Sequence, residues 1–329
     1  MGCRRHFLGR WTWMSALSLM ALVLAAGPVG AGEPKKVLVA TTPGGAATFL
    51  YHVAMKKGLD LRHGVKIEAK VMNPPEGERA VVYRAVDSYS MPTISALRAN
   101  LRGNRVRIVA PMIFLHTSVL VAPDAPYRRL EELRGKRLGS LDRITAAYVG
   151  LNMAAQTLGL QLERDFRMII AGSGQVLIGL LARREVDAIT MFEVFTTRLI
   201  ADGEARELLP MNEHLRQAMG RPFMALGVGA HQDWIDADRA RATGFSRAIL
   251  DTLSYIHANP EVIAEERGFL GLKTEPQVEL AKARLLRLYP RAWDTQTVDD
   301  AVSSILRAME MGLVERVPEA DVRAIFWRP

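Results

Sequence analysis

The sequence contains a single cysteine, Cys3, in a chain of 329 residues. It lies in an N-terminal segment that we expect to be removed, so the mature protein would have no disulfide, thiol nucleophile or cysteine metal site. The sequence also lacks HExxH, GxSxG, P-loop and CxxC patterns, and its histidines are scattered singly. No spacing of Asp and Glu singles out an acid/base pair. These absences argue against an enzyme and predict no cofactor and no metal.

Charge is dispersed along the chain. The formal net charge is +8, but no run of five or six basic residues occurs, and no pattern of stacking aromatics accompanies the basic residues. A nucleic-acid-binding role is therefore not expected. The mild positive field fits an anionic ligand or an acidic surface on a partner, without proving either.

Only one long apolar run occurs, at residues 11–26. Arg4, Arg5 and Arg10 precede or open it, and the small residues 29–31 (VGA) follow it, which is the pattern of a cleaved secretory signal peptide over residues 1–31. The run is shorter than the roughly 18 residues read as a membrane span. The segment RRHFL at residues 4–8 resembles the twin-arginine consensus, so the twin-arginine and the ordinary export routes both stay open. Removing this signal takes three arginines and lowers the net charge to +5.

Alternating strand and helix patterns fill the rest of the chain. Residues 36–40 (KVLVA) predict a strand, residues 41–46 (TTPGGA) a turn-rich loop, residues 48–57 a helix and residues 65–71 (VKIEAKV) a second strand. Further strands are expected at residues 106–111, 118–122 and 223–228, and a long helix over residues 240–258, which Asn259-Pro260 ends.

Residues 130–187 carry the most information. The segment 130–140 (LEELRGKRLGS) contains a short strand, a helix opens at Thr145, and residues 183–195 (RREVDAITMFEVF) contain a second strand. A helix N-terminus that faces strand ends suits a small ligand, because unpaired N–H groups and the positive end of the helix dipole point at it.

The order of these blocks resembles the periplasmic solute-binding proteins of ABC importers, of the nitrate, sulfonate, taurine and thiamine-precursor type. The resemblance covers nearly all of the mature chain and rests on the order of individually loose motifs. It implies an α/β protein with the two-lobe type II periplasmic binding fold, each lobe a mixed sheet flanked by helices, joined by two crossing hinge strands. Residues 32–122 and 223–329 would form lobe 1, and residues 123–222 lobe 2.

The resemblance places a small-molecule ligand between the lobes. The predicted ligand-binding residues lie in four places, at Thr42, Pro43 and Gly44, at Ser88, Tyr89 and Ser90, at Ser140, Thr145 and Ala146, and at Phe192 and Glu193. The alternative for Ser140 and Thr145 is plain helix capping, which needs no ligand.

Two residues near the expected cleft have competing interpretations. Glu193, if it faces the ligand, would disfavour sulfonate or nitrate and favour an amine, amidine or aminopyrimidine; the alternative is a solvated acid at the rim. His116 could contact ligand, or it could be a structural histidine with its polar groups satisfied.

The expected function is that of a periplasmic substrate-binding component, which binds a sulfonate, aminopyrimidine or aromatic acid as a monomer and delivers it to an inner-membrane permease. The alternatives are a solute-binding sensor subunit for a membrane receptor, and an enzyme like the thiamine-pyrimidine synthases of the same fold. Those synthases are marked by a cysteine-rich motif, which this chain lacks.

Overall fold

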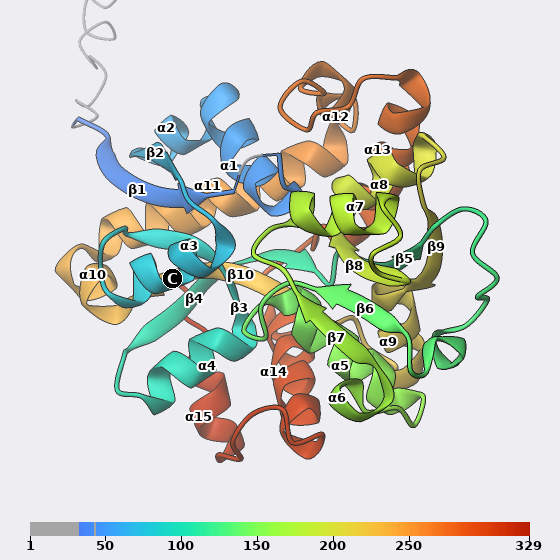
Figure 1. Cartoon of the computed structure of the whole chain (residues 1–329). Helices are drawn as coiled ribbons and strands as arrows, with labels where there is room; N and C mark the ends of the chain where they lie inside the picture. The colour runs from blue at the N-terminus through green and yellow to red at the C-terminus, as the bar shows by residue number, and fades with distance from the viewer. Residues whose placement is uncertain (1–32, 43) are drawn as a thin grey trace, which may run out of the picture.

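Two five-stranded mixed sheets form the framework of the protein. The computed structural model describes residues 33–42 and 44–329 (Figure 1); the expected signal peptide at residues 1–31 lies outside them. The first sheet has the spatial order β2 (Val65–Val71), β1 (Lys35–Thr41), β3 (Ser88–Pro92), β10 (Met224–His231) and β4 (Val106–Phe114). The second has the order β7 (Arg167–Ile170), β6 (Arg137–Ser140), β8 (Ala188–Phe192), β5 (Thr117–Val121) and β9 (Arg206–Pro210).

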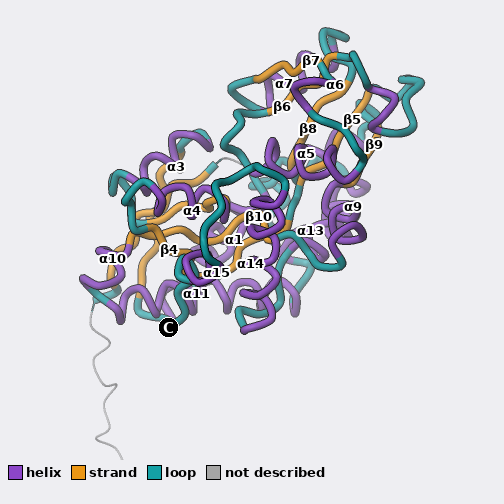
Figure 2. Tube along the Cα trace, turned by 90° about the horizontal axis from the view of Figure 1, so that it is seen from below, coloured by secondary structure: helices purple, strands orange, loops and turns teal. Residues whose placement is uncertain are grey.

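The two sheets share one topology. In each, the first three strands in spatial order are parallel to one another and the last strands are paired antiparallel. Figure 2 shows them in two separate bodies, one around β4 and β10 and the other around β5 to β9. This is the two-lobe α/β architecture expected from the sequence, with a mixed sheet in each lobe.

Helices cover both faces of the sheets. The chain before β5 forms helices α1 (Ala46–Lys56), α2 (Leu59–Arg62), α3 (Pro74–Val82) and α4 (Thr93–Leu101). The chain after β10 forms α10 (Gln232–Ala237), α11 (Arg239–Ala258), α12 (Val262–Glu265), α13 (Glu275–Leu288), α14 (Thr295–Glu310) and α15 (Glu319–Arg323). The chain between β5 and β10 forms the 3₁₀ turn Leu130–Leu133, α5 (Ala146–Thr157), α6 (Leu162–Asp165), α7 (Gly174–Ala182), α8 (Phe195–Ala201) and α9 (Met211–Met219).

The long helix expected at residues 240–258 is confirmed as α11. It begins where the Asp238 carboxylate accepts a hydrogen bond from the Arg241 N–H, and it ends before Asn259-Pro260. Its buried face packs against β4 and β2, so α11 and α1 cover one side of the first sheet. Helices α3 and α4 pack against β3, β4 and β10.

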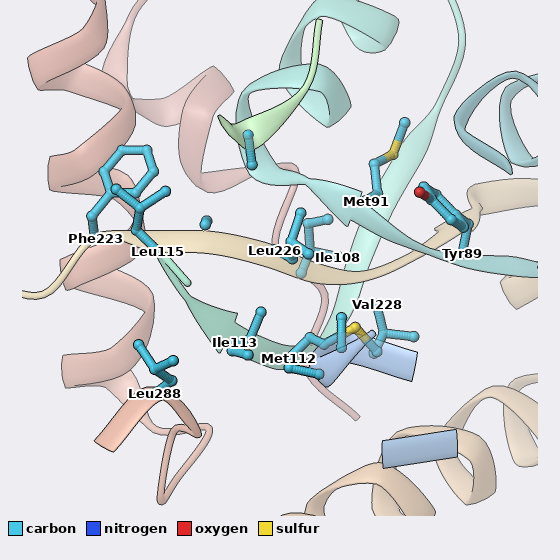
Figure 3. Close-up of a cluster of buried hydrophobic side chains, with 14 of the residues drawn as sticks. Tyr89, Met91, Ile108, Met112, Ile113, Leu115, Phe223, Leu226, Val228 and Leu288 are labelled. Atoms are coloured by element: carbon cyan, nitrogen blue, oxygen red, sulfur yellow. The ribbon is translucent and has the colours of Figure 1, made fainter. Parts of the chain in front are cut away.

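The chain crosses between the sheets at two adjacent points. The first is the link Leu115–His116 between β4 and β5, and the second is the link 220–223 between α9 and β10. The Leu115 N–H donates to the Phe223 carbonyl oxygen at 2.9 Å, which ties the two links together. Figure 3 shows both residues beside the buried cluster of β3, β4 and β10.

The two crossings lie next to the strands that the sequence places there. Residues 118–122 overlap β5, which pairs only with strands of the second sheet, and residues 223–228 overlap β10, which pairs only with strands of the first. The second sheet therefore begins at Thr117, earlier in the chain than the boundary at residue 123 that the sequence predicts. The exact bounds of the two lobes remain a proposal.

One close contact of helix α11 gives a stability prediction. A Cβ atom at Gly244 would overlap the carbonyl oxygen of His63, at the end of α2, and that oxygen cannot move without the backbone. We expect Gly244→Ala to lower the free energy of unfolding by about 1–3 kcal/mol, measured by urea titration of the circular dichroism signal. The matched control is Gly179→Ala in α7, where a Cβ meets only the mobile end of Arg183. Because alanine favours a helix, the control should be neutral or stabilise by up to about 1 kcal/mol; equal effects of the two changes would contradict the packing.

Candidate functional site

A cavity lies where the carboxyl ends of parallel strands from both sheets meet. An inner chamber of about 80 Å³ adjoins an outer chamber of about 400 Å³, and Thr42, Thr145 and Phe192 line both. The lining comes from segments that follow β1, β2 and β3 in the first sheet and β6, β7 and β8 in the second. In α/β proteins, ligands bind at such strand ends.

Two helices begin at the inner chamber. Helix α5 starts after Thr145, whose hydroxyl oxygen accepts a hydrogen bond from the Tyr148 N–H, and Ala146 and Ala147 line the chamber. Helix α1 starts at Ala46 on the opposite lobe, and its first N–H donates to the carbonyl oxygen of Glu193 at 3.1 Å. The free N–H groups and dipole of such an N-terminus favour an acceptor atom on a ligand.

The predicted ligand-binding residues divide into those that reach the cavity and those that do not. The residues that line it are Thr42, Tyr89, Ser90, Thr145, Ala146 and Phe192. Those outside the lining are Gly44, Ser88, Ser140 and Glu193, and Pro43 lies outside the described residues. Ser140 is buried and accepts a hydrogen bond from the Thr190 hydroxyl at 3.0 Å, so local packing accounts for its position. Ser88 is buried within β3.

Glu193 needs a correction, because neither a ligand-facing acid nor a solvated rim acid describes it. Its side chain is 1 % exposed, and one carboxylate oxygen accepts from the Arg284 guanidinium of α13 at 2.5 Å. The other oxygen accepts from the N–H and the hydroxyl of Thr197. Burial raises the pKa of Glu193 above its usual value, while the Arg284 charge and the Thr197 bonds act in the opposite direction.

Arg284 extends this cluster to a second acid. It donates to Glu207 of β9 at 2.7 and 3.1 Å, and the Glu207 carboxylate accepts from the Ser118 hydroxyl. Burial alone would lower the pKa of Arg284, but the bonds and charges of Glu207 and Glu193 raise it above its usual value. Arg284 therefore stays charged and holds α13 of the C-terminal part against the second sheet.

Several lining residues did not follow from the sequence patterns. In the inner chamber they are Gly45, Ala47, Thr48, Pro74, Glu78, Pro92, Thr117, Leu141, Ala147 and Leu226. In the outer chamber they are Asn73, Pro75, Asp142, Phe195 and the segment 170–175. His116, which the sequence offered as a possible ligand contact, lines the inner chamber. The segments 73–78 and 170–175 each follow a short strand and contain Pro or Gly, which is the signal that could have found them. Thr117 carried no such signal, because it opens a strand in an apolar run.

Charge in this lining is acidic, not basic. Glu78 of α3 lines the inner chamber and Asp142 the outer one, and among the described lining residues there is no Lys or Arg. Burial raises the pKa of Glu78 to about 7, against the lowering effects of the Ser95 hydroxyl and the Arg98 charge. Burial likewise lowers the pKa of His116 to about 4, so its imidazole is neutral at neutral pH.

Neither a metal-ion cluster nor a membrane-spanning helix is found in the described part of the chain. In residues 33–42 and 44–329, no three His, Cys, Asp or Glu side chains gather in a way that could hold a metal ion. Within the same residues, no helix combines the length and the apolar character that crossing a membrane requires.

The fold and the cavity define a two-lobed binding protein, and comparison with known proteins identifies its family. The profile of the family described as "ABC transporter, phosphonate, periplasmic substrate-binding protein" matches residues 53–237. The chain therefore belongs to this family of periplasmic substrate-binding proteins of ABC transporters, which confirms the resemblance found in the sequence. No curated protein sequence matches the chain.

Solved structures support the fold. A protein from Bordetella bronchiseptica RB50 is 20% identical with a TM-score of 0.73, over 90% of this chain and 95% of that chain. The alkanesulfonate-binding protein SsuA from Xanthomonas axonopodis pv. citri, bound to MOPS, is 16% identical with a TM-score of 0.70, over 90% and 99%. The aliphatic sulphonate-binding protein SsuA from Escherichia coli is 17% identical with a TM-score of 0.65, over 86% and 94%.

The first prediction from the site concerns the buried ion pair. Arg284→Met removes the guanidinium and leaves Glu193 buried without its cationic partner, which should cost about 3–5 kcal/mol of stability. Chemical denaturation measures the change. The control is Arg287→Met, which removes an exposed arginine one turn further along the same helix and should change stability by less than about 1 kcal/mol. A loss at Arg284 no larger than the loss at Arg287 would contradict the buried pair.

The second prediction concerns pH. Because the pKa of Glu78 is raised to about 7 in the folded state, the folded protein binds this proton more tightly than the unfolded chain does. The resulting stabilisation is present below about pH 4.5 and is lost as the pH rises through 7. Melting temperatures from pH 5 to 8 should therefore fall more steeply for the native protein than for Glu78→Gln.

The control for the pH series is Glu76→Gln, on the same helix. Glu76 is exposed and its carboxylate accepts from the Asn73 N–H in a capping box, a role that glutamine also fills. This variant should keep the steep pH dependence of the native protein. Parallel curves for Glu78→Gln and the native protein would mean that the Glu78 carboxyl titrates normally.

Proposed function

We propose that this protein is the substrate-binding component of an ABC importer, and that it binds a small organic solute in the cavity between its lobes and delivers it to a membrane permease. The observation that carries the proposal is the position of the cavity. Strand ends and a helix N-terminus from each sheet line the same chamber, so a ligand there contacts both lobes at once.

Such a ligand would stabilise one arrangement of the lobes. Beside the cavity, the Ala46 N–H donates to the Glu193 carbonyl oxygen, and the Ser95 hydroxyl lies 3.4 Å from the Ile144 carbonyl oxygen. Further hydrogen bonds join the lobes through α13, from Arg284 to Glu193 and from Gln277 to Asp202. The chain crosses between the sheets only through the short links at Leu115–His116 and 220–223, which are suited to act as a hinge. A ligand that contacts both lobes would bind the closed state more tightly than the open state, and so would shift the equilibrium toward closure.

The lobe bounds that follow from strand pairing differ from the sequence expectation. We propose that lobe 2 comprises residues 117–219 and that the remaining mature residues form lobe 1, with α13 reaching across to α8. Export through the signal at residues 1–31, a periplasmic location and a monomeric state are part of the same proposal.

Two alternatives use the same binding site. A sensor subunit would present the closed form to a membrane receptor instead of a permease, and loss of solute uptake on deletion of the gene distinguishes import from sensing. An enzyme of the same fold would change its ligand. Mass spectrometry of the solute after prolonged incubation tests this, and we expect the solute to be recovered unchanged.

A proline substitution tests whether the N-terminus of α5 holds the ligand. Proline is favoured at the first position of a helix, and the extended backbone of Thr145 suits the residue before a proline, so Ala146→Pro should keep the helix while removing one N–H. Losing that hydrogen bond should weaken solute binding by roughly three- to ten-fold, measured by titration calorimetry. The solute is taken from a thermal-shift panel of sulfonates, aminopyrimidines and aromatic acids.

The matched control is Thr295→Pro, at the first position of α14, where the N-cap Asp294 is also extended. Neither residue lines the cavity. Affinity should stay within two-fold of the native value in this variant. If Ala146→Pro binds the solute as tightly as the control does, the ligand lies elsewhere and the proposed function loses its site.

A further inference from the structure

Thr117 is the polar group in the inner chamber that packing leaves unexplained. Its side chain is 3 % exposed, and its hydroxyl has no hydrogen-bond partner among the described residues. Leaving a buried hydroxyl unsatisfied costs about 1–3 kcal/mol, so such a group needs an explanation.

The register of the second sheet shows where this hydroxyl points. Thr117 of β5 lies directly opposite Phe192 of β8, and directly opposed residues share a face of the sheet. Phe192 lines the cavity, so Thr117 faces the cavity too. Neighbouring Ser118 points to the other face, where its hydroxyl bonds Glu207 beside Arg284.

His116 adds a second unsatisfied atom next to Thr117. Its Nδ1 is buried without a partner among the described residues, and its ring meets Phe192 edge-on at a centroid distance of 6.2 Å. A neutral imidazole offers one donor and one acceptor and no charge. Thr117 and His116 together therefore offer hydrogen bonds to a ligand without attracting an anion.

The charges around the cavity point the same way. The two helix N-termini supply together about one positive charge, and the first N–H of α1 is already bonded to Glu193. The carboxyl groups of Glu78 and Asp142 in the lining oppose this positive charge. The Arg98 guanidinium lies near Glu78 but donates to the Leu313 carbonyl oxygen and lines a separate surface pocket. A phosphonate dianion would have to give up its hydration here without a cationic side chain to replace it.

We propose that the cavity selects a ligand of zero or single positive charge with an apolar body and an N–H-bearing head group, which Thr117, His116 and Glu78 recognise by hydrogen bonds. Amides, amidines and amino-substituted heteroaromatics are this class; phosphonates and sulfonates are disfavoured. The proposal rests on the proposed function, since it names the ligand class of that same cavity. The apolar lining that would receive the body comes from Ala47, Pro92, Leu141, Ala147, Phe192 and Leu226.

A series of compounds with one apolar body tests the charge preference. Benzamide, benzamidine, benzoate, benzenesulfonate and phenylphosphonate share a phenyl ring and differ only in head group. We expect titration calorimetry on the mature protein at pH 7.5 to show at least ten-fold tighter binding of benzamide or benzamidine than of any of the three anions. Tighter binding of benzenesulfonate or phenylphosphonate overturns the ligand class and leaves the proposed function standing. If neither benzamide nor benzamidine binds while a panel solute binds at the cavity, the ligand class is again overturned and the proposed function stands. If no compound binds, the result counts against both the ligand class and the proposed function.

Thr117→Val separates recognition from structure, because it should move stability and affinity in opposite directions. Valine keeps the shape and removes the unsatisfied hydroxyl, so the melting temperature should stay constant or rise. Affinity for the tighter of benzamide and benzamidine should fall roughly three- to ten-fold, because one hydrogen bond is lost. The control is Thr190→Val in β8, whose buried hydroxyl is already bonded to Ser140. It should lower the melting temperature and leave affinity within two-fold. Unchanged affinity in Thr117→Val would overturn the role of Thr117.

Glu78→Gln tests the acidic end of the same site. Removing this charge should weaken benzamidine roughly ten-fold relative to benzamide, and should bring benzoate closer to both. Glu76→Gln, exposed on the same helix, should leave the order of the five compounds unchanged. If Glu78→Gln also leaves that order unchanged, Glu78 does not contribute to the selection.

Discussion

Glu193 joins the parts of this protein that form the cavity. Its N–H donates to the His116 carbonyl oxygen at 2.9 Å and its carbonyl oxygen accepts from the first N–H of α1, while its carboxylate holds Arg284 and Thr197. One residue thus connects the end of β8, the crossing link, the start of α1 and helix α13. Because the carboxylate is buried, it depends on Arg284 for its charge to be tolerated. The cavity beside it is shaped by this arrangement, and the acid itself does not line that cavity.

The acid that does line the cavity is Glu78. It comes from α3 on the other lobe. Helix α3 follows β2, and β1, the parallel neighbour of β2, leads into α1. In the proposed selection of ligands, the carboxyl group therefore comes from the lobe built on the first sheet. Thr117, at the start of β5, and His116, in the crossing link, line the same chamber, whose lining also includes alanine, proline and aromatic carbon. A family profile named for phosphonate thus describes a chain whose own cavity carries no fixed cation among its described residues.

The sequence predicted the fold better than the site. Periodicity located β1, β2, α1 and α11, and the order of blocks predicted two mixed sheets, because these signals are local and depend on which face is buried. Predicted site residues line the cavity where a loop follows a strand with a helix behind it, as at Thr42, Thr145 and Phe192. Glu193 does not line it, because a partner 91 positions along the chain decides whether an acid is solvated, bound to ligand or paired. Thr117 was missed for a related reason, since only the pairing of β5 with β8 shows which way it points.

A crystal structure of the protein with its tightest-binding small molecule tests the central claim most directly. The account predicts ligand density beside Phe192 and the N-terminus of α5, within hydrogen-bonding distance of the Thr117 hydroxyl, with residues from both sheets in contact and the bond between Glu193 and Arg284 intact. Density confined to one lobe would contradict it. So would density in the adjoining pocket of about 120 Å³ beside Arg284 and Arg287, which shares His116 and Thr117 with the inner chamber.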